Sequence, residues 1–75
     1  MAMFADYVLN KETGRYEMQF VNQQYDLLMY IYFDEQTKTY KLNVSDEEAD
    51  KISRSWWGRG FDLQYWLKEG EHRLR

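Results

Sequence analysis

Residues 4–22 alternate apolar and polar side chains on either side of a short polar segment that contains Gly14. This pattern is typical of two half-buried strands joined by a turn, and glycine suits a turn position with positive φ. If Asn10 faces Arg15, three apolar cross-strand pairs share one face: Leu9 with Tyr16, Tyr7 with Met18, and Ala5 with Phe20. The other face is mostly polar, so a hairpin with one apolar face is predicted.

Residues 25–44 repeat this plan around the turn at 35–38. The predicted apolar pairs are Phe33 with Tyr40, Ile31 with Leu42, and Met29 with Val44. In the first of these two strands, Met29, Ile31 and Phe33 lie on the face of the apolar pairs. Leu28, Tyr30 and Tyr32 alternate with them and point to the opposite face, so this strand is apolar on both faces. Some other element or molecule should therefore cover that second face.

A helix is predicted from residue 46 to about residue 57. Ser45 followed by Glu48 forms a capping box, and the acids at 46–48 suit the positive end of the helix dipole. Ala49, Ile52 and Trp56 lie on one stripe, which assigns Trp56 to the core. Gly58 or Gly60 can adopt the left-handed conformation that ends a helix.

Residues 61–67 alternate apolar and polar side chains again, which favours a fifth strand. A short second helix that ends at Gly70 is the alternative. Residues 71–75 are charged and are expected to form a frayed tail. The sequence thus predicts an α+β fold, with an antiparallel four- to five-stranded sheet (β-β-β-β-α-β) and one helix packed on one face. Residues 1–70 would form a single compact domain.

The composition indicates which cellular compartment suits the protein. The 75 residues include no cysteine, which excludes disulfides, thiolate metal clusters and cysteine nucleophiles, and which suits a reducing cytoplasm. The longest apolar run, residues 27–33, is far shorter than the roughly 20 residues that span a bilayer. We therefore expect a cytoplasmic protein without a membrane segment.

The net charge of −3 is unevenly distributed. Residues 1–50 carry ten acids against four bases, or −6, whereas residues 51–75 carry three acids against six bases, or +3. Most of the chain should therefore repel nucleic acid.

Catalytic and metal-binding patterns are missing from the sequence. His72 is the only histidine and lies in the predicted tail, where nothing holds it near a substrate. The acids at 46–50 point in different directions around a helix and lack the spacing of a calcium loop. We expect no enzyme activity, metal or cofactor.

The segment RSWWGRG at 54–60 has two interpretations. Trp57 could stack on bases while arginines reach phosphates, which would make a small nucleic-acid-binding domain. Its residues would be Arg54, Trp57, Arg59 and Lys68, together with the basic C-terminal tail. The favoured interpretation is a helix end that the glycines terminate and the arginines stabilise.

Aromatic residues make up 19% of the chain, and some of them should lie outside so small a core. The second sheet face is the best candidate for a partner-binding surface, with Leu28, Tyr30, Tyr32, Lys41 and Trp66. The predicted function is a non-enzymatic, acidic protein-interaction module that docks an aromatic sheet face or a strand edge on another protein. An inhibitor or regulator of a basic, nucleic-acid-handling protein would be of this kind. A structural homodimer that buries the tyrosine face is a further alternative.

Overall fold

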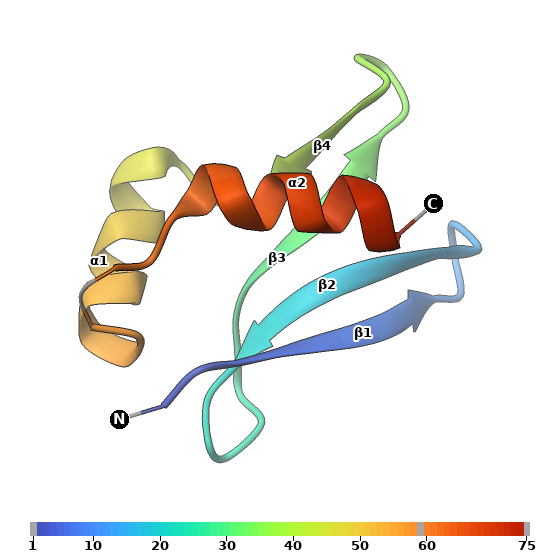
Figure 1. Ribbon diagram of the computed structural model, residues 1–75. Helices are drawn as coiled ribbons and strands as arrows, with labels where there is room; N and C mark the ends of the chain where they lie inside the picture. The colour runs from blue at the N-terminus through green and yellow to red at the C-terminus, as the bar shows by residue number, and fades with distance from the viewer. Residues whose placement is uncertain (1, 59, 75) are drawn as a thin grey trace.

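The computed structural model describes residues 2–58 and 60–74. Its elements are β1 (Phe4–Asn10), β2 (Arg15–Val21), β3 (Leu27–Asp34), β4 (Thr39–Leu42), α1 (Asp46–Trp56) and α2 (Leu63–Arg73). The strands form one antiparallel sheet in the order β1-β2-β3-β4 (Figure 1). The α+β class and the antiparallel four-stranded sheet are confirmed, whereas the fifth strand and the single helix are wrong, because residues 63–73 form a second helix.

The two hairpins have the predicted register. Leu9 faces Tyr16, Tyr7 faces Met18 and Ala5 faces Phe20, and Gly14 turns the chain at φ 73°. The second hairpin pairs Phe33 with Tyr40 and Ile31 with Leu42, but β4 ends there, so the expected pair of Met29 with Val44 lies beyond the ladder. Beyond β4, Asn43 Oδ1 accepts a hydrogen bond of 2.7 Å from the Tyr30 N–H.

Helix α1 begins and ends as the sequence predicts. Ser45 Oγ accepts a hydrogen bond of 3.2 Å from the Glu48 N–H, which satisfies one of the free donors of the first turn. The N–H groups of Trp57 and Gly58 both donate to the Ser53 carbonyl, and Gly58 has φ 93°. Trp56 packs against the core, as its place on the apolar stripe indicated.

Residues 63–73 form a helix because they have an N-terminal cap and apolar residues at helical spacing. Asp62 caps the helix by accepting from the N–H groups of Gln64 and Tyr65. The buried and half-buried apolar positions follow helical spacing through Leu63, Trp66, Leu67, Gly70 and Leu74. The helix also passes Gly70, since the Leu74 N–H donates to the Gly70 carbonyl and Leu74 is buried. The stretch expected as a tail is therefore helical as far as Arg73.

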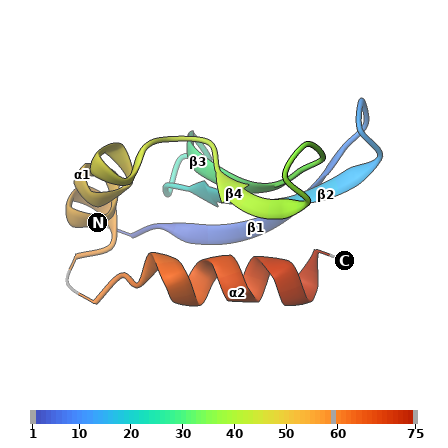
Figure 2. The ribbon, with the colours of Figure 1, turned by 90° about the horizontal axis from the view of Figure 1, so that it is seen from above.

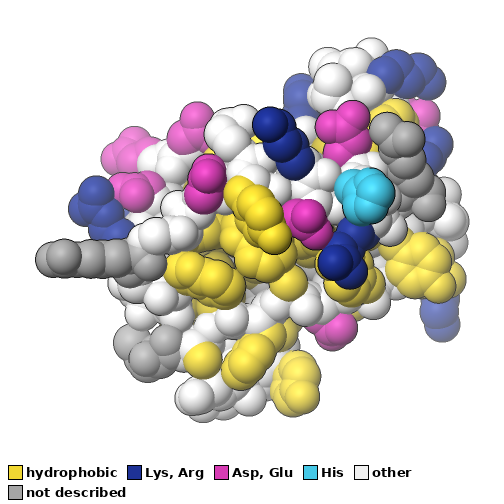
Figure 3. All heavy atoms as spheres, viewed as in Figure 1, with side chains coloured by type: hydrophobic (Ala, Val, Ile, Leu, Met, Phe, Trp, Pro, Cys, Tyr) yellow, Lys and Arg dark blue, Asp and Glu magenta, His cyan; other side chains and the backbone are white. Residues whose placement is uncertain are grey.

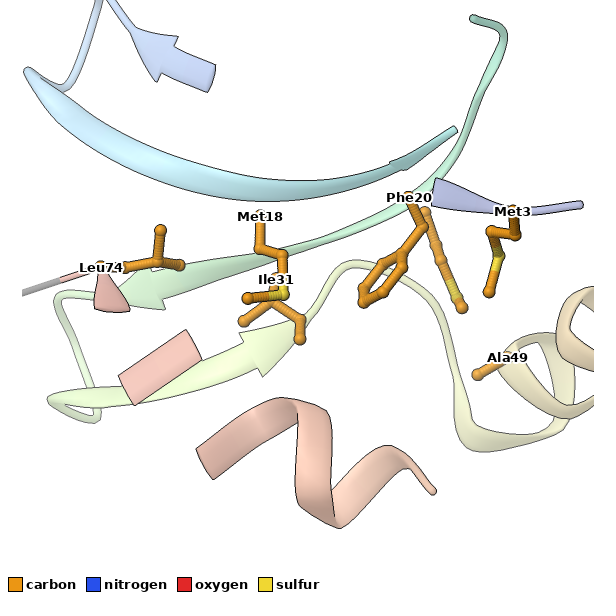
Figure 4. Packing of buried hydrophobic residues seen from close by; sticks show 7 residues of the cluster. Met3, Met18, Phe20, Ile31, Ala49 and Leu74 are labelled. Carbon is orange, nitrogen blue, oxygen red and sulfur yellow. The ribbon is translucent and has the colours of Figure 1, made fainter. Parts of the chain in front are cut away.

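The sheet and α2 form two layers, and α1 lies at one end of them (Figure 2). Met18, Phe20, Met29 and Ile31 of the sheet are fully buried, and Met3, Ala49 and Leu74 complete the core (Figure 4). A Cβ at Gly70 would lie 3.1 Å from Ile31 Cγ2, which is tighter than ordinary contact. Glycine at this position therefore allows α2 to approach the sheet closely.

Candidate interaction site on the open sheet face

Helix α2 packs against β3 and β4 on one side of the sheet, and the opposite side has no helix over it in the described part of the chain (Figure 2). The pairing register assigns alternate strand residues to this opposite side, which we call the open face. Its residues include Phe4, Asp6, Val8, Glu17, Gln19, Val21, Leu27, Tyr30, Tyr32 and Lys41.

Three of the predicted partner-binding residues meet on the open face. The rings of Tyr30 and Tyr32 are both half-buried, with centroids 5.8 Å apart and planes tilted by 59°. Lys41 lies opposite Tyr32 in the neighbouring strand. The structure thus forms a tyrosine pair with a charged side chain at its border.

The charge of Lys41 is offset by a neighbour. Its Nζ lies 3.1 Å from Asp34 Oδ2, and the Gln36 N–H donates to the other oxygen of the same carboxylate. The hydrogen bond from Lys41, followed by that from Gln36, lowers the pKa of Asp34 below its ordinary value. Asp34 therefore stays ionised at neutral pH and neutralises Lys41 beside the tyrosine pair.

The other two predicted residues lie elsewhere. The register shifts between Phe20 and Val21, so Leu27 faces Val21, and Leu28 is half-buried and packs against the core. Trp66 belongs to α2 on the other side of the sheet, where its ring lies 5.4 Å from that of Phe20. The prediction that Trp66 joins the tyrosines is wrong because it assumed a fifth strand.

A second apolar region lies at the other end of the open face and was missed by the sequence analysis. Phe4, Val21 and Leu27 face one another across three strands. Phe4 and Leu27 are each 51% exposed, while Val21 between them is buried. Beside this row, a shallow hollow of about 520 Å³ is lined partly by Phe4, Val21 and Tyr25.

Tyr25 is held in an unusual position by Asn22. It has φ 64°, a left-handed conformation that costs a residue other than glycine about 1 to 3 kcal/mol, and it is 80% exposed. Asn22 Oδ1 accepts 2.9 Å hydrogen bonds from the N–H groups of Gln24 and Asp26, and its Nδ2 donates to the Asp26 carboxylate. The Tyr25 N–H donates to the Asn22 carbonyl. The buried asparagine thereby fixes a turn that presents a tyrosine to solvent.

The change Asn22→Ala tests this role. It removes the acceptor for two backbone N–H groups, so we expect the free energy of unfolding to fall by about 1 to 3 kcal/mol. The amides of Gln24 and Asp26 should also exchange faster with solvent. Urea unfolding and amide hydrogen exchange measure both effects, with Gln23→Ala on the exposed neighbour as the matched control. Equal effects of the two changes would contradict a specific role for Asn22.

The structure describes three residues of the nucleic-acid alternative, Arg54, Trp57 and Lys68. Arg54 pairs with Asp50 at 3.1 Å, and Arg54 and Lys68 line two different hollows. Trp57 is 38% exposed and packs its ring against Phe61 and Trp66, at centroid distances of 5.6 and 5.8 Å. Arg59 lies outside the described residues. The geometry here is that of a helix end packed against α2.

His72 and the acidic side chains were also considered in the sequence as catalytic or metal-binding candidates. His72 lines a shallow hollow with Tyr7 and Arg73. Within residues 2–58 and 60–74, no three His, Cys, Asp or Glu side chains form a group that could hold a metal ion.

Neither helix of that described part is long and apolar enough to cross a membrane. Comparisons with family models, curated proteins and solved structures find no match for the chain.

Proposed function

We propose that this protein is a non-enzymatic interaction module that docks its open face on another protein. The observation that carries the proposal is a sheet face over which neither helix of the described chain lies and which has two apolar regions on it. One is the pair Tyr30 and Tyr32, and the other is the row of Phe4, Val21 and Leu27 with Tyr25 beside it. Aromatic side chains surrounded by polar ones are the usual make-up of an interface centre.

The charges on this face favour a basic partner. Asp6 is exposed, and Glu17 accepts a hydrogen bond from the uncharged amide of Asn10. Lys41 and Arg15 are each paired with an acid, Asp34 and Glu35 respectively. The unneutralised charge is thus negative, and it complements an apolar surface surrounded by lysine or arginine. A small inhibitor or regulator of a protein that handles nucleic acid would have these properties.

The double change Tyr30→Ser, Tyr32→Ser tests the proposal. Cross-strand side chains on one face of a sheet contribute only about 0.2 to 1 kcal/mol each, so the fold should persist. A tyrosine anchor at an interface contributes about 2 kcal/mol or more, so partner binding should weaken about 30-fold or more. Proteins captured by the parent chain are identified by mass spectrometry, and the purified partner is then titrated against each variant.

Tyr65→Ser is the matched control, since Tyr65 is 54% exposed but lies on α2. Its binding should equal that of the parent chain. Equal binding by the tyrosine double variant would contradict the proposal, as would a partner that is lost on nuclease treatment. A double variant that unfolds would show that the two rings act as core.

A further inference from the structure

Strand β1 has an unprotected outer edge. It is an edge strand of seven residues, whereas β4 at the other edge has four (Figure 1). Edge strands are usually protected by lysine, proline or a bulge, and β1 contains none of these. Asp6 is its single charged residue. The strand is therefore a template for pairing with another strand.

The backbone groups that face this outer edge can be assigned. The Asn10 carbonyl accepts a 2.8 Å hydrogen bond from the Gly14 N–H, so Asn10 directs its backbone toward the hairpin partner. In an antiparallel pair every second residue does the same, which leaves alternate residues directed outward. Ala5, Tyr7 and Leu9 thus present their N–H and C=O groups to solvent.

Apolar side chains adjoin the same edge on the helix side of the sheet. Helix α2 packs mainly on β3 and β4. Its end reaches Tyr7, which lines a shallow hollow with His72 and Arg73, but Tyr7 remains 41% exposed, Leu9 43% and Tyr16 53%. Figure 3 shows apolar side chains at the end of the molecule where the β1–β2 hairpin lies, beyond the end of α2. A strand added at β1 would cover part of this surface.

We propose that the added strand is β1 of a second copy of this chain, paired antiparallel with Tyr7 opposite the Tyr7 of its mate. This register pairs all of residues 4–10 and uses every outward backbone group. It places the small Ala5 opposite the larger Leu9, and it places Asp6 opposite Val8 rather than opposite another aspartate.

The two neighbouring registers pair fewer residues and would be less stable. Centring on Asp6 pairs only residues 4–8 and sets two like charges directly opposite each other, which is destabilising. Centring on Val8 pairs only residues 6–10, so Ala5 keeps its outward N–H and C=O without partners. The strand is thus self-complementary in one register. That register is a two-fold arrangement of the kind most homodimers use.

The dimer would extend the proposed function without depending on it. A two-fold axis perpendicular to the sheet places both α2 helices on one side of a continuous sheet. The two open faces then lie together on the other side. A partner with two basic sites would meet two tyrosine pairs at once, which raises its apparent affinity.

Sedimentation velocity and isotope-filtered NMR on the full chain test the proposal. We expect a dimer, with contacts between the Ala5 methyl of a labelled copy and the Leu9 methyls of an unlabelled copy. Tyr7→Pro removes an outward N–H that β2 does not use, and edge strands tolerate proline. The dimer dissociation constant should therefore rise about tenfold or more while the monomer stays folded. Tyr7→Phe, which keeps the N–H, should leave the dimer unchanged.

Leu9→Lys is a second disruptive variant, which retains every backbone N–H and so keeps the test valid if the proline variant does not fold. A dissociation constant of about 1 mM corresponds to a binding free energy of only about 4 kcal/mol. A chain that stays monomeric at that concentration would overturn the proposal. Loss of the dimer in the Tyr30→Ser, Tyr32→Ser variant would also overturn it, because the copies would then meet through their open faces. Partner binding by a monomeric Tyr7→Pro variant would separate this inference from the proposed function.

Discussion

Replacing Phe20 with Ala is expected to lower the free energy of unfolding by about 3 to 5 kcal/mol. The Phe20 side chain is fully buried in β2, and its ring lies 5.8 Å from that of Phe61 and 5.4 Å from that of Trp66. Truncation would leave a cavity between the sheet and α2. Because small domains have total stabilities of about 5 to 15 kcal/mol, this loss is a large part of the total free energy of unfolding.

Urea unfolding followed by tryptophan fluorescence measures this loss. Tyr16→Ala is the matched control, because Tyr16 lies in the same strand and on the same face but is 53% exposed. Its replacement should cost clearly less than that of Phe20. If the two costs are equal, then α2 does not pack over Phe20 as described, and the two-layer core is incorrect.

The sheet and α1 could be predicted because their determinants are local. Gly14 fixes the first turn, and the alternation on either side of it then sets the pairs from Leu9 with Tyr16 to Ala5 with Phe20. Ser45 and Gly58 mark the two ends of α1 by capping chemistry that depends on neighbouring residues alone.

Helix α2 could not be predicted in the same way because its decisive contacts are tertiary. Residues 61–67 fit a strand by alternation, and the helical stripe becomes clear only when Gly70 and Leu74 are included. Glycine is a poor helix former in isolation, yet here it is buried where α2 approaches Ile31. The packing against Ile31 outweighs that local preference.

One part of the candidate site could be predicted from the sequence, and another part could not. Tyr30, Tyr32 and Lys41 were grouped correctly because strand parity alone places them on one face. The row of Phe4, Val21 and Leu27 was missed because a register shift after Phe20 brings Leu27 opposite Val21. The position of Tyr25 depends on the turn that the buried side chain of Asn22 fixes by accepting backbone hydrogen bonds. Asparagine is common in turns, so the sequence does not indicate that this one is buried.

Replacing Trp66 with Ala is expected to be the second most costly change. Trp66 packs its ring edge-on against Phe20 and also contacts Trp57 and Phe61. Truncation of a core tryptophan costs about 3 to 5 kcal/mol, and we expect a value near 3 kcal/mol because Trp66 is only partly buried. Tyr65→Ala is the control, since this neighbour on α2 is 54% exposed and should cost much less.

Trp66 also distinguishes the two possible positions of residues 61–67. If this segment were a fifth strand with Trp66 on the open face, Trp66→Ala would spare the fold and weaken partner binding. With Trp66 on α2 beneath the sheet, the same change should destabilise the fold strongly, and the molecules that remain folded should bind the partner as tightly as the parent chain. Unfolding in urea and partner titration at a temperature where the variant is still folded give the two quantities. A stable variant with weakened binding would show that Trp66 lies on the open face, and it would restore the fifth strand.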